Sequence, residues 1–447
     1  MKRVLVLGAG LVTGPLVHYL LEAGLLDQED FQVKVASRTL EKAQKLIGSA
    51  KNGIAEQLDV SDEKALERLI SKADLSISLL PYVYHPLVAR LCIEHKKMMV
   101  TASYVKDEML ALDEDAKRAG VILLNEIGVD PGIDHMSAMQ VIDRIRRSGG
   151  KLVSFTSYCG GLPAPDANDN PYGYKFSWSP RGVILAGKNP ARYLRDGKVV
   201  DIPGEDLFAH HSPVEIEGFG TLEGYPNRDS LPYIETYGVK GVKNMFRGTL
   251  RYPGWCETLK KIAELGLLDE AERTDLTGLT FADLTARLIG GAKENLKSGL
   301  ASFLKIEGSS RVVSNLEWLG FLSDEPLPEG AKSPLDVLAA RMLEKMQYAP
   351  GERDLLVMQH EFIAEYPDRT EKTTSTMIDY GIPHGDTSMS RTVGLPAAIA
   401  TRLILQGKID LTGVQVPVIP EIYEPVLAEL ESMGIGFTEK TEIIRGC

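Results

Sequence analysis

A glycine-rich turn near the start of the chain stands between an apolar strand pattern and an apolar helix pattern. In the stretch RVLVLGAGLVTGPLVHYLLEAG, residues 4–7 are all apolar, and the apolar residues from 16 to 21 recur at helical spacing. Further short apolar runs then alternate with helical stretches up to residue 126, namely VKVAS, IAEQLDV, LSISLL, KMMVTAS and VILLNEI. This alternation predicts a parallel sheet with helices on both faces.

The turn predicts a Rossmann-like dinucleotide-binding domain over residues 1–126. Gly8 allows a tight turn, and Gly10 has no Cβ, so a pyrophosphate can approach the amides at the positive end of the following helix. Gly14, the third glycine, comes one residue late, with Thr13 in its usual place, so we expect this helix to pack differently. A turn without a ligand is the structural alternative. The predicted cofactor contacts here are Gly8, Ala9, Gly10, Leu11 and Val12.

The end of the second predicted strand indicates which dinucleotide is bound. An NAD site commonly has Asp or Glu at this point, whereas the 2′-phosphate of NADP requires cationic or hydroxyl donors. This chain has Ser37, Arg38 and Thr39 there and no acid. The three residues favour NADP, with NAD as the alternative. A helix N-cap by Ser37 or Thr39 would be the purely structural explanation.

Polar and aromatic residues follow the next predicted strands, at the carboxyl ends where open parallel sheets bind ligands. Asp59 and Val60 are expected at the adenine. The further cofactor contacts predicted at these ends are Leu80, Ala102 and Ser103. We expect one edge of the sheet to be crowded by Tyr82, Tyr84, His85, Ser103 and Tyr104, although each alone is typical of a packed loop residue.

The segment NEIGVDPGIDH, residues 125–135, brings acids, an amide and a histidine to a Pro-Gly turn. Asp134 has the position of a helix cap. Asp130 precedes Pro131, which favours an extended backbone at Asp130. We therefore expect Asp130 to belong to the functional site.

Composition limits the classes of function. With 447 residues, 44% of them hydrophobic and 25% charged, the chain can form two or three domains. The net charge of −12 argues against a nucleic acid or an anionic membrane as partner. The apolar runs are too short for a membrane span, and the start MKRVLVLGAG does not resemble a signal peptide, so a cytoplasmic protein is expected. The cysteines and histidines show no ligand spacing, and no metal is predicted.

Beyond residue 126 the pattern changes to a mixed sheet with a helical block. KLVSFTSYC, FRGTLRY, DLLVMQHEFIAEY and EKTTSTMIDYG are strand-like, whereas residues 255–346 are helical and show no site chemistry. Residues 159–182, CGGLPAPDANDNPYGYKFSWSPRG, have neither strand nor helix periodicity. The predicted fold is α/β: a Rossmann-like domain over 1–126, a mixed-sheet domain over 127–254 and 347–388, a helical insertion over 255–346, and a segment, 389–447, that returns to the dinucleotide domain.

The chain resembles the L-glutamate-forming saccharopine dehydrogenases, which include fungal saccharopine reductase and the carboxyl-terminal half of the bifunctional aminoadipic semialdehyde synthase. The resemblance lies in SLLPYVYHPLV, VTASYV, NEIGVDPGIDH, SYCGGLPAPDANDNPYGYKFSWSPRGV, GYPNRDS, RGTLRY, EWLG and TVGLPAAIA, so it covers nearly the whole chain. It implies the reversible, nicotinamide-dependent interconversion of saccharopine with glutamate and aminoadipic semialdehyde. It also leaves open a homodimer and a separate lysine-ketoglutarate reductase partner.

The resemblance also assigns substrate contacts. Arginine can bind a carboxylate through two parallel hydrogen bonds, and saccharopine has three carboxylates. The implied substrate contacts are Arg228, Thr249, Leu250 and Arg251, with Ser103, Tyr104 and Asp130 nearby, and Ser179 is implied to contact the cofactor. Arg247 is expected at a solvated strand end.

The residue that moves protons is the least determined part of the site. Carbinolamine and imine chemistry requires acid and base groups, and the candidates in order are Asp130, then Tyr104 and Cys159, with His135 also considered. Two other functions fit less well. A carboxynorspermidine dehydrogenase would need fewer cationic groups, and a catalytically silent NADP-binding scaffold would not need the motifs above.

Overall fold

The computed structural model describes residues 1–26, 31–178 and 180–446. The chain divides into two compact units. Unit 1 comprises Met1–Lys151 and Met377–Thr438, and unit 2 comprises Leu152–Thr376 and Glu439–Cys447.

Unit 1 is built on a sheet of seven parallel strands in the order β15-β6-β5-β4-β1-β2-β3. The strands are β1 (Lys2–Leu7), β2 (Phe31–Ser37), β3 (Gly53–Gln57), β4 (Leu75–Ser78), β5 (Met98–Val100), β6 (Ile122–Leu124) and β15 (Gly413–Gln415). The first six have the order of a dinucleotide-binding fold, and β15 extends the sheet beside β6. The predicted fold class is therefore confirmed.

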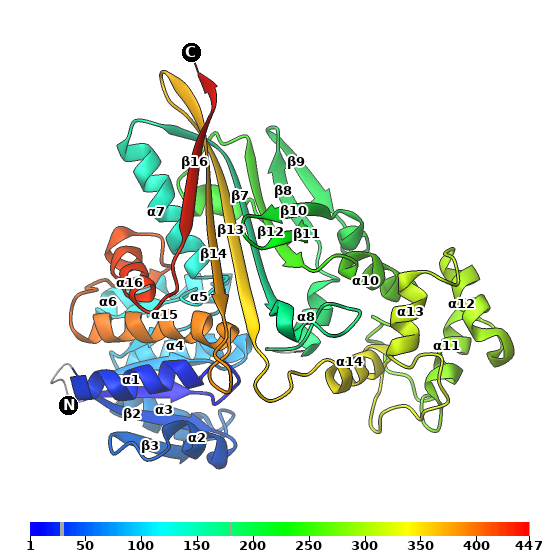
Figure 1. Ribbon diagram of the computed structural model, residues 1–447. Helices are drawn as coiled ribbons and strands as arrows, with labels where there is room; N and C mark the ends of the chain where they lie inside the picture. The colour runs from blue at the N-terminus through cyan, green and yellow to red at the C-terminus, as the bar shows by residue number, and fades with distance from the viewer. Residues whose placement is uncertain (27–30, 179, 447) are drawn as a thin grey trace. The chain divides into compact units, whose positions relative to one another are not determined.

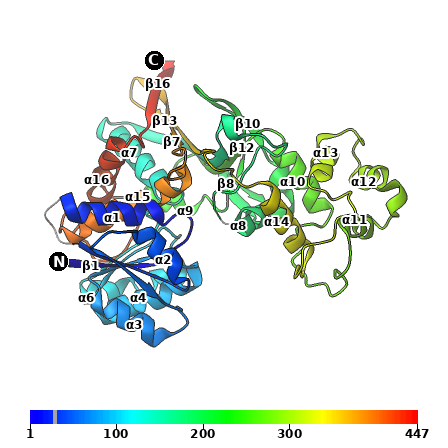
Figure 2. The same cartoon turned by 60° about the horizontal axis from the view of Figure 1, so that its bottom comes forward.

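Helices cover both faces of this sheet. Figure 2 shows α1 and α2 on one face and α3, α4 and α6 on the other. The helices of unit 1 are α1 (Gly14–Leu26), α2 (Leu40–Ile47), α3 (Glu63–Lys72), α4 (His85–Glu94), α5 (Asp107–Leu110), α6 (Asp113–Ala119), α7 (Ile133–Arg147), α15 (Ser388–Leu405) and α16 (Pro420–Ser432), with the short 3₁₀ helix η1 (Tyr82–Tyr84) before α4. Apolar side chains of α3 and α4 pack against β1 in one buried cluster.

Helix α15 lies against α1 and explains how the late third glycine of the turn is accommodated. A Cβ on Gly394 of α15 would lie 3.0 Å from the Val12 carbonyl oxygen and 3.2 Å from the Leu16 amide nitrogen. The glycine that permits close approach to the first turn of α1 therefore comes from α15. Tyr19 of α1 is also hydrogen-bonded to Arg402 of α15 at 2.6 Å and to Glu429 of α16.

Unit 2 contains most of a nine-stranded mixed sheet whose main path is β10-β11-β12-β7-β13-β14-β16. Its strands are β7 (Lys151–Pro163), β8 (Ala191–Arg195), β9 (Lys198–Ile202), β10 (Ser212–Ile216), β11 (Gly220–Pro226), β12 (Asn244–Arg251), β13 (Asp354–Glu365), β14 (Arg369–Tyr380) and β16 (Thr438–Gly446). β7 and β12 are parallel, whereas β11 and β12 are antiparallel. Figure 1 shows β13, β14 and β16 as long neighbouring strands.

Two sequence predictions differ from these observations. β7 continues to Pro163, four residues beyond the strand-like run that ends at Cys159, and the missing periodicity of residues 159–182 did not indicate this extension. The reason is tertiary: Cys159 pairs in register with Thr249 of β12, and a Cβ on Gly160 would lie 2.6 Å from the Leu250 carbonyl oxygen. The boundaries of the compact units also differ from the predicted domain boundaries, because residues 127–151 lie in unit 1 and β16 pairs with β14.

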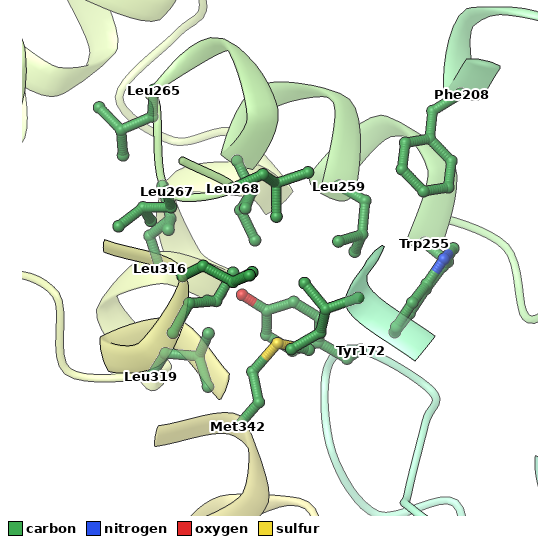
Figure 3. Packing of buried hydrophobic residues seen from close by; sticks show 14 of the residues in the cluster. Tyr172, Phe208, Trp255, Leu259, Leu265, Leu267, Leu268, Leu316, Leu319 and Met342 are labelled. Carbon is green, nitrogen blue, oxygen red and sulfur yellow. The ribbon is translucent and has the colours of Figure 1, made fainter. Parts of the chain in front are cut away.

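The helices of unit 2 include α8 (Pro180–Ala186), α9 (Pro232–Thr236), α10 (Trp255–Glu264), α11 (Phe281–Ile289), α12 (Leu296–Leu304), α13 (Arg311–Trp318) and α14 (Pro334–Lys345). All of these helices except α9 share a buried cluster with the aromatic loop residues Tyr172, Tyr174 and Phe176. Figure 3 shows Tyr172 surrounded by Leu and Met side chains of this block. Among the residues that the structure describes, no helix combines the length and apolar character of a membrane span.

Candidate active site

The order of the strands marks the carboxyl ends of β1 and β4 as the ligand-binding edge of the unit 1 sheet. Chain order reverses between these two neighbouring strands, and open α/β sheets bind ligands outside the strand ends at such a switch point. The glycine turn follows β1 directly, and Ser103 follows β5. The predicted cofactor contacts of unit 1 therefore gather at one edge of this sheet.

The glycine turn has the geometry that a pyrophosphate requires. Gly8 has a φ of +112°, and a Cβ there would lie 3.1 Å from the Leu79 carbonyl oxygen, so another residue would be strained. A Cβ on Gly10 would meet no atom within 4 Å, which leaves open space beside the backbone. The buried Thr13 closes the turn, because its Oγ1 accepts from the Gly10 amide at 3.0 Å. The turn and the start of α1 therefore fit a dinucleotide.

The residues after β2 remain available to a 2′-phosphate. Arg38 and Thr39 are exposed, and the Thr39 side chain makes no capping hydrogen bond at the start of α2. The Ser37 Oγ accepts from the Thr39 amide at 3.3 Å, which holds the three residues in a compact bend. The donors of Ser61 hold the pKa of the exposed Asp59 below its ordinary value despite some desolvation, and the charge of Arg38 contributes to the same shift.

Val60, Leu80 and Ala102 contribute mainly through packing and backbone. The side chains of Val60 and Leu80 are partly buried against the apolar cluster of α3 and α4. A Cβ on Gly128 would lie 2.9 Å from the Ala102 Cβ, so Ala102 lies directly against the loop after β6. Only backbone atoms and limited side-chain surface of these residues can reach a cofactor.

Tyr104 and Asp130 form the central polar pair of the unit 1 site. The Tyr104 hydroxyl donates a hydrogen bond of 2.8 Å to Asp130 Oδ1, and both side chains are partly exposed. The structure thus brings together two of the residues expected to move protons. A phenol bound to a carboxylate can pass a proton between substrate and carboxylate.

A buried acid that the sequence interpretation did not select holds this pair in place. Glu126 Oε1 accepts from the Val105 amide at 2.8 Å, and the Glu126 amide donates to the Ser103 carbonyl at 3.1 Å. Glu126 Oε2 lies 2.8 Å from His135 Nε2. His135 is fully buried, so it supports Glu126 and cannot reach a ligand directly. The sequence could have indicated this role of Glu126 through its position inside the NEIGVDPGIDH segment.

Asp134 is not the N-cap residue of α7: Gly132 has that position, and Asp134 lies in the first turn. Its Oδ1 accepts from the Gly132 amide at 2.6 Å and from the His135 amide at 2.8 Å, at the beginning of α7. The carboxylate is buried. It therefore stabilises the loop that carries Asp130.

Unit 2 contains a buried arginine at the end of β12. The Arg251 guanidinium lies 4.9 Å from the Tyr174 ring centroid and 5.6 Å from that of Trp255. One terminal nitrogen donates to the Leu250 carbonyl at 2.7 Å, while Nε has no partner among the described residues. A buried guanidinium with an unused N–H suits an anionic group.

The other residues expected in the substrate-binding part differ in exposure. Leu250 is fully buried, so only its backbone is available, and Cys159 is buried opposite Thr249 on the paired strands. Arg228 is exposed and has a left-handed φ of +56°. Ser179 lies outside the described residues. The expectation that Arg247 is solvated is wrong: its side chain is buried, and its guanidinium lies 4.3 Å from the Tyr233 ring centroid.

The loop before Ser179 is locked by an ion-pair group. The buried Lys175 ammonium contacts both carboxylate oxygens of Glu352, at 2.8 and 2.7 Å, and Asp169 at 2.9 Å. Three ionic contacts on one buried side chain balance its charge. Lys175 therefore stiffens the loop, and its charge is already used.

Comparisons with known proteins agree with this arrangement. Residues 4–124 match the saccharopine dehydrogenase NADP binding domain, and residues 128–435 match the saccharopine dehydrogenase C-terminal domain. The chain is 42% identical to saccharopine dehydrogenase (NADP⁺, L-glutamate-forming) of Schizosaccharomyces pombe, over 98% of this chain and 99% of that protein. It is 40% identical to the mitochondrial alpha-aminoadipic semialdehyde synthase of Bos taurus, over 99% of this chain but 48% of that protein.

A solved structure gives the same result. Apo saccharopine dehydrogenase (L-Glu forming) of Saccharomyces cerevisiae matches with a TM-score of 0.91 and 41% identity, over 99% of this chain and 100% of that one. Both family models, which together span residues 4–435, bear the same family name. The chain therefore belongs to the saccharopine dehydrogenase family.

Proposed function

We propose that this protein is an NADP-dependent, L-glutamate-forming saccharopine dehydrogenase. The observation that carries the proposal is the similarity, along the full length of both chains, to the Schizosaccharomyces pombe enzyme of that name. The glycine turn and the Ser37-Arg38-Thr39 bend support it from the side of the cofactor. Tyr104, Asp130 and Arg251 support it from the side of the substrate.

The reaction oxidises the secondary amine of saccharopine to an imine, which water then hydrolyses to glutamate and aminoadipic semialdehyde. NADP⁺, when bound, would supply the hydride acceptor for the carbon on that nitrogen that becomes the aldehyde carbon of aminoadipic semialdehyde. During oxidation a proton must leave the amine nitrogen. During hydrolysis a proton must leave the attacking water, and one must reach the nitrogen that departs with glutamate. The protein therefore has to place a proton acceptor near this nitrogen and hold a long anionic substrate in a fixed orientation.

Unit 1 supplies the cofactor-binding and proton-transfer groups in this proposal. The turn from Gly8 to Val12 would hold the pyrophosphate at the start of α1. Arg38 and the neighbouring hydroxyls would bind the 2′-phosphate. The Tyr104 hydroxyl accepts the proton of the substrate as it passes its own proton to Asp130, which the 2.8 Å hydrogen bond makes possible.

Unit 2 supplies the groups that bind carboxylates. The buried Arg251 offers its unused Nε–H, and the rings of Tyr174 and Trp255 fix the plane of the guanidinium. Arg228 adds a second, exposed cation. A charge-assisted pair in a site with little water is stronger than one on an open surface.

The test is the appearance of reduced cofactor, followed at the absorbance band of NADPH, when saccharopine is added to the purified protein with NADP⁺. We expect turnover with saccharopine and none with carboxynorspermidine. Turnover with carboxynorspermidine alone would assign the other reaction. Tight NADP⁺ binding without turnover of either compound would indicate a silent binding protein.

The cellular setting is part of the same proposal. We propose a cytoplasmic location, which the acidic composition and the buried free thiols of Cys92, Cys159 and Cys256 support. A second copy of this chain and a lysine-ketoglutarate reductase are the proposed protein partners. The latter is suggested by the bovine synthase, which is about twice as long as the segment it shares with this chain.

A further inference from the structure

His85 links the buried ends of β4 and β5 to the edge of the cofactor site. It is the first residue of α4 and is 3% exposed. Its Nδ1 lies 2.9 Å from the Ser78 Oγ, and its Nε2 lies 2.7 Å from the Ser103 Oγ. The ring therefore joins a fully buried serine of β4 to the half-buried serine that follows β5.

Thr101 completes this group and leaves the imidazole little freedom to rotate. Its Oγ1 lies 3.4 Å from His85 Nε2 and accepts from the Ser103 amide at 3.3 Å. Burial lowers the pKa of His85 to about 4, so the ring is neutral near pH 7. A neutral imidazole donates through one nitrogen and accepts through the other. Ser78 and Ser103 therefore play opposite roles in their bonds to the ring.

The position of Ser103 gives this linkage a consequence for catalysis. In a dinucleotide-binding sheet, the half that begins with β4 faces the nicotinamide part of the cofactor. The Ser103 backbone is fixed separately, since its carbonyl accepts from the Glu126 amide at 3.1 Å. This backbone contact does not restrict rotation of the Ser103 side chain. The hydrogen bond to His85 does restrict it.

We propose that His85 is a positioning residue that fixes the Ser103 hydroxyl, and through it the nicotinamide part of NADP, in the pose needed for hydride transfer. This inference rests on the proposed function. His85 itself touches neither substrate nor cofactor. Its influence passes through one hydrogen bond, between its Nε2 and the Ser103 Oγ.

The two nitrogens of His85 can be tested separately with two amide side chains. The amide of His85→Asn can occupy the place of Nδ1, so it keeps the Ser78 contact and loses Ser103. The amide of His85→Gln reaches the place of Nε2, so it keeps the Ser103 contact and loses Ser78. Ser78→Ala removes the buried partner alone and serves as the matched control for His85→Gln.

The measurement is kcat for saccharopine oxidation, together with the Kd for NADP⁺. For His85→Asn we expect kcat to fall about tenfold while Kd changes by less than about twofold, because the phosphates dominate cofactor affinity and the lost bond affects only orientation. His85→Gln and Ser78→Ala are expected to keep kcat within about twofold of wild type. In a Ser103→Ala background, His85→Asn should lower kcat no further.

Three results would overturn the proposal: equal loss of kcat in His85→Gln and His85→Asn, loss in Ser78→Ala as large as in His85→Asn, or additive losses in the double variant. Each would mean that His85 only holds β4 and α4 together. If His85→Asn does not fold, His85→Gln decides the question, since the proposal requires it to be nearly as active as wild type.

A second readout separates this inference from the proposed function. If the wild type shows no saccharopine turnover, the proposed function fails, and positioning is read from the nicotinamide fluorescence of bound NADPH. A fixed nicotinamide should give a shifted and enhanced emission that His85→Asn reduces and His85→Gln retains. Identical emission from both variants would overturn the positioning role whatever the substrate is.

Discussion

The Tyr104 hydroxyl donates a 2.8 Å hydrogen bond to Asp130 Oδ1, across the loops that follow β5 and β6. With its proton directed to the carboxylate, the phenol oxygen presents lone pairs to its other side. It is thus able to accept a proton from a substrate nitrogen or water while Asp130 takes its own. Glu126 fixes the backbone beside Tyr104, so the pair is formed before a substrate arrives.

The first prediction concerns this pair. Tyr104→Phe removes the group that exchanges protons, and Asp130→Asn removes the acceptor behind it, so each should lower kcat for saccharopine oxidation about 100-fold. The kcat of the double variant should lie within about threefold of the kcat of the less active single variant, because the two groups act as one unit. Tyr82→Phe, at an exposed tyrosine stacked against Lys106, is the control and should keep full activity. Fully additive losses would show that Tyr104 and Asp130 act separately.

The second prediction concerns the arginines of unit 2. Arg251→Ala and Arg228→Ala should each weaken saccharopine binding by about 2 to 4 kcal/mol, since each leaves a carboxylate without its partner. Titration of each variant with saccharopine gives this loss, and the Kd for NADP⁺ should hardly change. Arg192→Ala is the matched control, because Arg192 already forms an ion pair with Asp201 at 2.8 Å. Equal loss of saccharopine and NADP⁺ affinity would mean that these two arginines are wrongly assigned.

The fold of unit 1 was predictable because its signals are local. A strand, a glycine turn and a helix follow one another in the sequence, and the left-handed φ of Gly8 is a property of that turn alone. The position of Arg38 after β2 is equally local. The contact between Gly394 and the first turn of α1 joins residues almost 400 positions apart, and no periodicity in the sequence indicates it.

The parts of the candidate site that were missed depend on burial and pairing. Arg247 reads as an exposed strand end, yet it is buried beside Tyr233, because packing outweighed the usual preference of arginine for water. Glu126 was not selected from the sequence, because its role depends on its partners: its carboxylate accepts from the Val105 amide in the loop after β5 and lies 2.8 Å from His135 Nε2 of α7. Such roles follow from which strands become neighbours, and that information is tertiary.

The third prediction concerns cofactor choice. Arg38 and the hydroxyls of Ser37 and Thr39 should favour the 2′-phosphate of NADP by about 1.5 to 3 kcal/mol, which is about ten- to a hundredfold in kcat/KM. Arg38→Ala should remove most of this preference, and Ser37→Asp should reverse it by repulsion. The measurement is kcat/KM for saccharopine oxidation with NADP⁺ and with NAD⁺ in all three proteins. A wild type that prefers NAD⁺ tenfold would contradict this role of the bend.

The fourth prediction concerns the stability of the fold in acid. Burial lowers the pKa of His85 to about 4 from an ordinary value of 6.5, so between these values the unfolded chain binds a proton that the folded chain does not. The stabilisation is present above pH 6.5 and is lost as the pH falls toward 4. His85 alone should thus lower the free energy of unfolding by about 2 kcal/mol between pH 7.5 and pH 5.

Urea unfolding of wild type and His85→Gln at both pH values isolates this contribution from that of the carboxylates. The loss of stability on acidification should be about 2 kcal/mol smaller in His85→Gln, because glutamine does not titrate. Equal losses in the two proteins would mean that the buried ring is protonated in the folded state.

The fifth prediction concerns a buried hydroxyl in unit 2. Tyr172 is 2% exposed, and its hydroxyl has no hydrogen-bond partner among the described residues. Figure 3 shows it among the side chains of Leu316, Leu319 and Met342. Burying an unpaired hydroxyl costs free energy, so Tyr172→Phe should raise the free energy of unfolding by about 1 kcal/mol.

A buried tyrosine with a partner provides the contrast for this fifth prediction. The Tyr423 hydroxyl donates to Asp143 Oδ2 at 2.8 Å, and Tyr423→Phe should therefore destabilise unit 1 by about 1 kcal/mol. Urea or thermal unfolding of both variants against wild type should give shifts of opposite sign. A Tyr172→Phe protein as destabilised as Tyr423→Phe would mean that the Tyr172 hydroxyl has a partner in solution, such as a buried water between α13 and α14, and that this core is not dry.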